Sequence, residues 1–206
     1  PNYNFSPIEK FLKACKDNQG RDIPKEFTLV GITLPQNPGG VANIDPSDVI
    51  AVIEKEHLAG DLDIIPHLSC KDINTDSLTS TLVGYRKRGI ETILALTGDK
   101  PAAAQSVFEV ESVGLLSLIK RQNQNEILGA KPGEWDRVHQ FYAGAAVSPF
   151  KYTEPSLMQQ YYKLEKKIAA GAQFLITQVG WDWRKSLELM QYLKQNNILI
   201  PVIGNV

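Results

Sequence analysis

Apolar, β-branched runs alternate along this chain with segments whose apolar residues recur at helical spacing. The first kind of run predicts strands and the second predicts amphipathic helices. Strands are predicted over residues 27–34, 63–69, 91–96, 140–147, 173–178 and 198–203. Parallel neighbours need a long crossover connection, so this alternation predicts βαβ units and a parallel sheet.

Cap and turn residues indicate where the intervening helices begin and end. The Asp-Pro-Ser sequence at residues 45–47 is typical of an N-cap followed by a proline in the first turn. The next helix is predicted to begin at Thr75 and to run to about Lys87, with Gly89 stopping it. Further helices are predicted over residues 6–16 and about 110–122, from Glu154 to near Ala169, and after the cap residue Asp182.

Two α/β architectures fit such a chain: an open doubly wound sheet and a closed (β/α)8 TIM barrel. A nucleotide-binding open sheet usually has a glycine-rich turn after its first strand, but residues 32–40 lack the GxGxxG spacing. Polar residues instead fall where the predicted strands end, namely Thr33, His67, Asp99, Ser148 and Gln178. In TIM barrels the strand ends and the loops after them build the active site, so this pattern favours the barrel.

The predicted strands are fewer than the eight of a complete barrel. The helix predicted over residues 6–16 would then follow an absent first strand, and the last strand would lie beyond Val206. No linker or repeat divides the sequence. We therefore expect residues 1–206 to form a single TIM-barrel catalytic domain that is truncated at both ends.

Charge and cysteine content narrow the function classes. The net charge is −1, so no basic field is present to attract nucleic acid or an anionic membrane. No apolar run is long enough to span a bilayer. Cys15 and Cys70 are far apart and form no CxxC pair, which fits a reducing cytoplasm and argues against a zinc site. We expect a cytoplasmic protein without nucleic-acid or membrane partners.

The polar strand ends have both structural and functional interpretations. Asp99 follows Gly98 directly and is either a turn or helix-cap residue or a carboxylate at the barrel mouth. His67 lies in an apolar run, where a histidine is commonly a satisfied core group, but beside Thr33 it can also bind a planar polar ligand. A buried Gln178 amide would need a partner, either a ligand or a backbone group.

Other candidates are more ambiguous. Lys166 and Lys167 end a predicted helix, where they either face solvent or contact a phosphate. Cys70 is predicted to be a small buried hydrophobe. Aromatic residues also gather near the strand-end loops, where they either cap the barrel or flank a ring system: Trp135, Phe150, Tyr152, Trp181 and Trp183. Chemistry alone indicates a TIM-type enzyme that binds a planar organic ligand.

Three strings carry a family resemblance. They are IPHLSCKD at residues 65–72, GIETILALTGD at 89–99 and KIAAGAQFLITQ at 167–178. Their order and spacing resemble the FAD-dependent 5,10-methylenetetrahydrofolate reductase family, over nearly the whole segment from Phe27 onward. The resemblance implies a barrel that binds FAD at its strand ends. NAD(P)H or another donor would reduce the flavin, which would pass hydride to methylenetetrahydrofolate and give 5-methyltetrahydrofolate for one-carbon metabolism and methionine biosynthesis.

The resemblance also assigns residues. FAD contacts are implied for Thr33, His67, Leu96, Thr97, Gly98, Asp99, Phe108, Lys166 and Lys167. Asp99 would be the catalytic carboxylate that stabilises a cationic folate intermediate. Lys167 matches a lysine near the FAD phosphates, and Gln178 would hydrogen-bond the folate pterin. No metal is implied, and we expect an oligomer or a complex subunit.

Departures from the family pattern leave alternatives open. The acidic residue of the family's first strand, in an EFxPP-like motif, has no counterpart here: either that strand is cut away from this segment, as the strand register suggests, or the protein lacks the acid. Thr97 also stands where some members carry Arg. One alternative is a catalytically diverged folate- and flavin-binding barrel that acts as a subunit or regulatory partner. Another is an unrelated phosphate-sugar aldolase, which would need a Schiff-base lysine at a strand end. The predicted strand ends carry Thr, His, Asp and Gln instead.

Overall fold

Six parallel strands form one sheet, and helices connect them. The computed structural model describes residues 6–17, 29–100, 105–124 and 140–205. Its helices are α1 (Ser6–Asp17), α2 (Pro46–Lys55), α3 (Thr75–Lys87), α4 (Ser112–Asn123), α5 (Glu154–Ala169) and α6 (Trp183–Gln195). Its strands are β1 (Gly31–Leu34), β2 (Asp63–Ser69), β3 (Thr92–Leu96), β4 (Tyr142–Val147), β5 (Phe174–Thr177) and β6 (Val202–Ile203), and Pro38–Gly40 form a short 3-10 turn.

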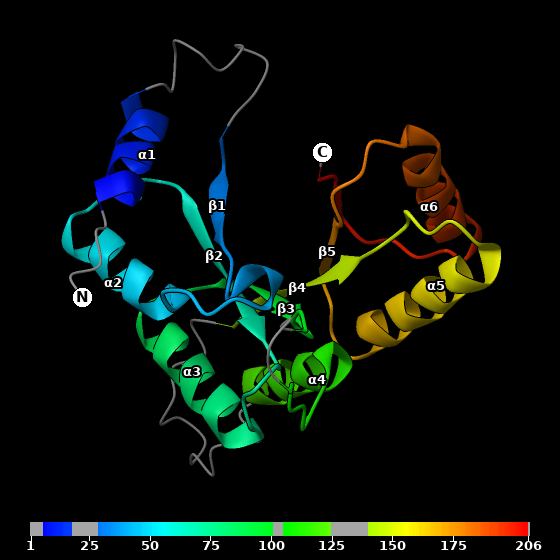
Figure 1. Cartoon of the computed structure of the whole chain (residues 1–206), viewed down its shortest axis with the longest axis horizontal. Coiled ribbons are helices and arrows are strands. Elements are labelled where there is room, and N and C mark those ends of the chain that lie inside the picture. Colours follow the sequence, from blue (N-terminus) through cyan, green and yellow to red (C-terminus); the bar gives the residue numbers. More distant parts are fainter. Residues whose placement is uncertain (1–5, 18–28, 101–104, 125–139, 206) are drawn as a thin grey trace.

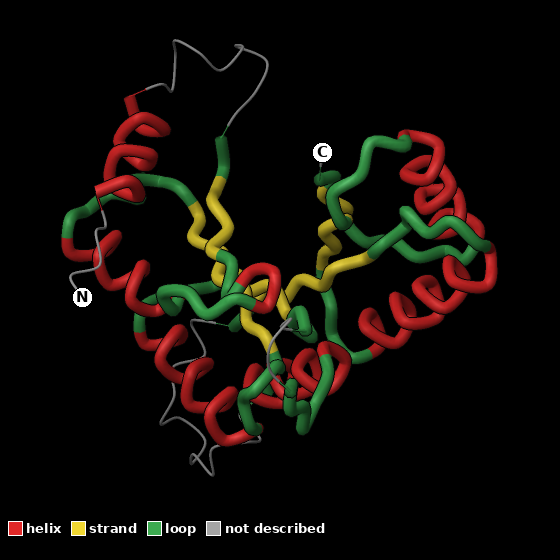
Figure 2. Tube along the Cα trace, viewed as in Figure 1, coloured by secondary structure: helices red, strands yellow, loops and turns green. Residues whose placement is uncertain are grey.

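The order of the strands decides between the two architectures. Neighbours in the sheet run β1-β2-β3-β4-β5-β6, so each strand is added on the same side of the previous one. A doubly wound sheet reverses this order at a switch point, whereas a barrel does not. The strands form a curved sheet and the helices form an arc on its outer side (Figures 1 and 2). The prediction of an α/β, incomplete TIM-barrel segment is confirmed.

The core lies between the sheet and this outer arc of helices. β3 contributes Ile93 and Ala95, and α4 contributes Leu115 and Leu116, all of them fully buried. Cys70 is also fully buried in this cluster, as predicted for a small apolar side chain. Each buried leucine contributes ~2 kcal/mol relative to exposure. Packing of these apolar side chains against the helices therefore holds the strands in place and fixes the positions of their polar ends.

Side-chain caps begin three of the helices, α2, α3 and α6, close to where the sequence predicts. Asp45 and Asp182 each accept the backbone N–H two residues further on, at 2.8 and 3.0 Å. Asn74, one residue before the predicted start of α3, caps that helix at 2.8 Å. Gly89 has a φ of 72°, so it stops α3 in the left-handed conformation expected of a terminating glycine.

The last strand is shorter than predicted. Pairing in β6 covers only Val202 and Ile203 rather than residues 198–203. Pro201 has no N–H to donate to the ladder, although its carbonyl accepts a 2.9 Å hydrogen bond from the Leu175 backbone. Ile198 and Ile200 pack against the core without pairing, which explains why their apolar pattern predicted a strand.

Candidate functional site

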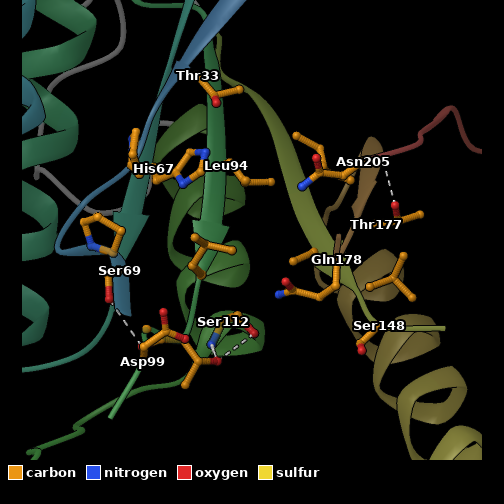
Figure 3. A pocket seen from close by; sticks show the side chains of 18 of the residues that line it. Thr33, His67, Ser69, Leu94, Asp99, Ser112, Ser148, Thr177, Gln178 and Asn205 are labelled. Atoms are coloured by element: carbon orange, nitrogen blue, oxygen red, sulfur yellow. Dashed lines mark hydrogen bonds between the residues drawn. The ribbon is translucent and has the colours of Figure 1, made fainter. Parts of the chain in front are cut away.

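A cavity of about 550 Å³ opens where the strands end. Its lining includes the five polar strand-end residues that the sequence singled out: Thr33, His67, Asp99, Ser148 and Gln178. Figure 3 shows them around one space, with Thr33 and His67 across from Gln178. Ligand pockets measure roughly 300–1,000 Å³, so this cavity has the size of a cofactor or substrate site.

His67 lies on β2 and reaches this cavity with one nitrogen unbonded. Its Nε2 is buried and has no hydrogen-bond partner among the described residues. Burial lowers the pKa of the imidazole below its ordinary value, so the ring is neutral near pH 7. A buried polar atom without a partner is costly, and a ligand that offers a hydrogen bond at this point relieves that cost. His67 is therefore not a core histidine with all its hydrogen bonds satisfied, because Nε2 lacks a partner among the described residues.

The Thr97-Gly98-Asp99 turn places a carboxylate at the cavity. Gly98 has a φ of 97°, and a Cβ there would lie 2.2 Å from Ser69 Oγ, so only glycine fits. Asp99 Oδ2 accepts a 3.1 Å hydrogen bond from the Gly39 backbone N–H, in the loop after β1. The next helix begins at Ser112, so Asp99 is not its cap. A fixed, solvent-accessible carboxylate therefore lines the cavity.

Lys167, on α5, supplies a cation to the same cavity. Its Nζ donates a 2.6 Å hydrogen bond to the Ala146 carbonyl and lines the cavity. Burial and, to a lesser extent, the charge of Lys163 lower the pKa of Lys167 to about 8, with Glu111 acting in the other direction. Lys163 and Glu111 themselves pair at 2.7 Å. Lys166, by contrast, is exposed and lies outside the cavity lining, as expected of a solvated helix end.

Gln178 differs in one respect from its sequence interpretation. Its backbone N–H donates to the Val147 carbonyl at 2.8 Å, but its side chain is exposed and makes no hydrogen bond to another described residue. The amide therefore has no burial cost to offset, and the argument that it must have a partner is wrong. Figure 3 shows it pointing into the cavity, where both its donor and its acceptor are free for a ligand.

With this geometry in view, comparison with known proteins identifies the family. The sequence model described as methylenetetrahydrofolate reductase matches residues 26–206. The chain belongs to the methylenetetrahydrofolate reductase family. This confirms the resemblance carried by the three strings, and each string contributes residues to the cavity: His67, Asp99 and Gln178 among them.

Individual relatives are distant in sequence. The chain is 25% identical over 146 residues to Methylenetetrahydrofolate reductase (NADH) 1 of Arabidopsis thaliana, covering 68% of this chain and 24% of that protein. It is 25% identical over 179 residues to the 5,10-methylenetetrahydrofolate reductase of Buchnera aphidicola, covering 86% of this chain and 54% of that protein. The Salmonella typhimurium 5,10-methylenetetrahydrofolate reductase is 26% identical over 148 residues, or 70% and 44%. The chain thus spans about a quarter to a half of these relatives.

Thr97, which departs from the family pattern, has a structural use in this reductase-family chain. Its Oγ1 donates to Ser112 Oγ at 3.1 Å and accepts the Ser112 backbone N–H at 3.3 Å, at the start of α4. Glu111, the N-cap residue of that helix, makes no side-chain cap of its own. The Thr97 hydroxyl is therefore occupied within the protein, and its neighbours Leu96 and Gly98 line the cavity.

Some predicted contacts lie away from the cavity. Phe108 is 38% exposed and is not among the lining residues. The aromatic residues after the strands do not flank the cavity either: Tyr152, Trp181 and Trp183 are exposed, and Phe150 packs closely against Gly180. Trp135 lies outside the described residues. Among the described residues that line the cavity there is no phenylalanine, tyrosine or tryptophan.

Several lining residues were not anticipated from the sequence. They are Gln36, Ser69, Ser112, Gln160 and Asn205. Gln36 and Asn205 follow strands, so the rule that found the other strand ends applied to them as well. Gln160 comes from the middle of α5, and no sequence signal separates it from the other polar residues of that helix.

Two features are absent from the described part of the chain. No helix there is long and apolar enough to cross a membrane. No group of three or more histidine, cysteine, aspartate or glutamate side chains is arranged there to hold a metal ion.

Proposed function

We propose that the strand-end cavity binds FAD and supports reduction of 5,10-methylenetetrahydrofolate to 5-methyltetrahydrofolate. The observation that carries this proposal is the convergence of His67, Asp99 and Gln178, one from each family string, on a single cavity. On this proposal residues 1–206 contribute most of one barrel domain. The electron donor is a nicotinamide or another reductant.

The described residues fit a flavin in three respects. The unpartnered His67 Nε2 offers a hydrogen bond to the polar edge of a ring. Gly98 lines the cavity without a side chain, so nothing projects from this position into the path of a flat ligand. Lys167 offers a point charge for a phosphate. When bound, FAD would supply hydride from its reduced N5 position.

The folate would lie on the side of Gln178 and Asp99. The free Gln178 amide can donate and accept at once, which suits the paired donors and acceptors of a pterin edge. Reduction requires a folate iminium cation, whose carbon accepts the hydride while its C=N bond becomes a single bond. The Asp99 carboxylate, held by the Gly39 amide, stabilises that cation electrostatically.

Flavin binding tests the first half of the proposal. The purified protein is titrated with FAD, and visible absorbance and flavin fluorescence report binding. We expect saturable binding that is weakened at least about tenfold in His67→Leu, which removes the unpartnered nitrogen. Absence of FAD binding by the wild-type protein would contradict the proposal.

A diverged, non-catalytic barrel is the second candidate, and one observation favours it. Among the described residues that line the cavity, Asp99 is the only carboxylate, so no second acid is present there to protonate the folate. This candidate predicts FAD and folate binding without turnover. Failure to form 5-methyltetrahydrofolate with NADH, NADPH and a reduced ferredoxin-type donor, in protein that binds both ligands, would favour it over the reductase.

A further inference from the structure

The loop between β1 and α2 is fastened to the strand ends by one side chain with two hydrogen bonds. Gln36 Oε1 accepts the Ser69 backbone N–H at 2.8 Å, at the end of β2. Gln36 Nε2 donates to Asp45 Oδ2 at 3.1 Å, while the other oxygen of Asp45 caps α2. Both ends of one planar amide are therefore used, and they join β2 to the start of α2.

The same loop delivers a backbone amide to the proposed catalytic carboxylate. Gly39 N donates to Asp99 Oδ2 at 3.1 Å, across 60 residues of sequence. The loop turns back on itself through positive φ angles at Asn37, Gly39 and Gly40, of 45°, 65° and 74°. Asn37 Oδ1 also accepts the Asn43 backbone N–H at 2.9 Å, which closes the turn. The position of the Gly39 amide therefore depends on how the loop is anchored.

We propose that Gln36 is a positioning residue: by anchoring this loop it fixes the Gly39 amide, and through it the orientation of the Asp99 carboxylate. The inference rests on the proposed function, in which Asp99 faces the folate cation. Asp99 is exposed, so without the amide its carboxylate would rotate freely in solvent. Misplacement of a catalytic group by about 1 Å can cost about 100-fold in rate, so the anchor of the loop that holds the Asp99 carboxylate matters.

The amide of Gln36 is suited to this task because it donates and accepts at once. Methionine has a similar length but forms neither hydrogen bond. Glutamate keeps the acceptor for Ser69 N–H but places a second carboxylate against Asp45. A proton shared between those two carboxylates restores the missing donor, so the defect of Gln36→Glu should diminish as the pH falls toward about 5.

Half-reaction kinetics test the inference. Stopped-flow measurements follow flavin reduction by the donor and flavin reoxidation by methylenetetrahydrofolate in Gln36→Met, with exposed Gln191→Met on α6 as the matched control. We expect Gln36→Met to slow reoxidation by about 10- to 100-fold while FAD affinity and flavin reduction change less than about threefold. As the pH falls toward about 5, the reoxidation rate of Gln36→Glu should approach that of wild type. The reoxidation rate of Gln36→Met should show no such recovery. Equal slowing of both half-reactions, or no pH-dependent recovery, would overturn the inference.

Hydrogen exchange gives a readout that needs no activity. In ligand-free protein, the peptide containing Gly39 should exchange faster in Gln36→Met than in wild type or Gln191→Met. Unchanged exchange there would overturn the anchoring role even if the protein is a reductase. If the wild-type protein binds no FAD while Gln36→Met still exchanges faster than wild type, the proposed function is overturned instead, and with it the catalytic role of the anchor.

Discussion

At the scale of single residues, the site joins groups with opposite electrostatic requirements. Asp99 is an exposed carboxylate held by one backbone amide, whereas Lys167 is an ammonium group that burial makes easier to deprotonate. His67 is neutral and keeps one unpaired nitrogen. Such a set suits a ligand with a phosphate at one end, a polar ring between, and a positive charge that develops near the carboxylate.

Asp99→Asn tests the carboxylate. The amide oxygen can still accept the Gly39 N–H, so the local structure should persist, while the negative charge is lost. We expect reoxidation of reduced flavin by folate to slow by about 100-fold and flavin reduction by the donor to change much less, because the cation forms only on the folate. Stopped-flow absorbance measures both steps. Equal effects on the two steps would contradict the assigned role.

Gln178→Leu tests the exposed amide. The substitution preserves much of the side-chain volume but removes both hydrogen-bonding groups. We expect folate affinity to fall by about tenfold, equivalent to the loss of one or two hydrogen bonds, with FAD affinity nearly unchanged. Folate titration of the FAD-loaded protein measures the first quantity. An unchanged folate affinity would exclude Gln178 from the folate site.

The pH dependence of FAD binding tests Lys167. In free protein its ammonium form is lost as the pH rises through about 8, whereas a bound phosphate holds the proton. FAD affinity should therefore be constant below about pH 7 and fall by up to about tenfold per pH unit above pH 8. Lys167→Arg, which stays charged, should remove this fall, and Lys167→Met should bind weakly at every pH. A wild-type affinity that is flat from pH 7 to about 9 would contradict a phosphate contact at Lys167.

Residue types and their positions after strands were enough to predict where His67, Asp99 and Gln178 meet. The hydrogen bonds around the cavity were not predictable from local pattern. Gln36 bonds Ser69, 33 positions away in the sequence, and Gly39 bonds Asp99, 60 positions away. Burial was also misjudged at Gln178, since the residue that ends a buried strand already lies outside the core. The local sequence pattern thus identifies candidate functional residues, whereas tertiary contacts determine the hydrogen-bond partners of each.

At the scale of elements, the strands are rigid supports and their terminal turns place the functional groups. The turn after β3 is the most constrained of those that carry predicted site residues, because Gly98 combines a positive φ with close contact to Ser69 and Lys71. Helix boundaries were predicted closely where a cap residue marks them, as at Asp45 and Asp182. β6 was over-predicted because residues 198–203 are all apolar, whereas Pro201 within that run has no N–H to pair and only Val202 and Ile203 join the ladder.

Gly98→Ala tests the turn against a matched glycine. A methyl group at residue 98 would lie 2.2 Å from Ser69 Oγ at a φ of 97°, so we expect destabilisation by more than about 1 kcal/mol and loss of FAD binding. Gly84→Ala in α3, where an added Cβ meets nothing within 4 Å, should instead stabilise by up to about 1 kcal/mol. Urea unfolding compares the two. Equal stability of both variants would contradict the constraint at Gly98.

At the scale of the whole molecule, sequential strand order brings all the strand ends to one side. With six parallel strands in the order β1 to β6, residues from Thr33 to Asn205 reach a single cavity. This much followed from the alternation of strand and helix patterns, since parallel strands joined by helices must point the same way. The curvature of the sheet depends on the tilt and stagger of all its strands together, so the pattern of no single element reports it.

One measurement tests the central claim, that this cavity is the flavin and folate site of a reductase. The FAD-loaded protein is reduced anaerobically and mixed with 5,10-methylenetetrahydrofolate, and flavin absorbance and folate products are followed together. The account predicts that flavin absorbance returns as one equivalent of 5-methyltetrahydrofolate forms, and that Asp99→Asn slows this return. Flavin that stays reduced in the wild-type protein, with methylenetetrahydrofolate recovered unchanged, would contradict it.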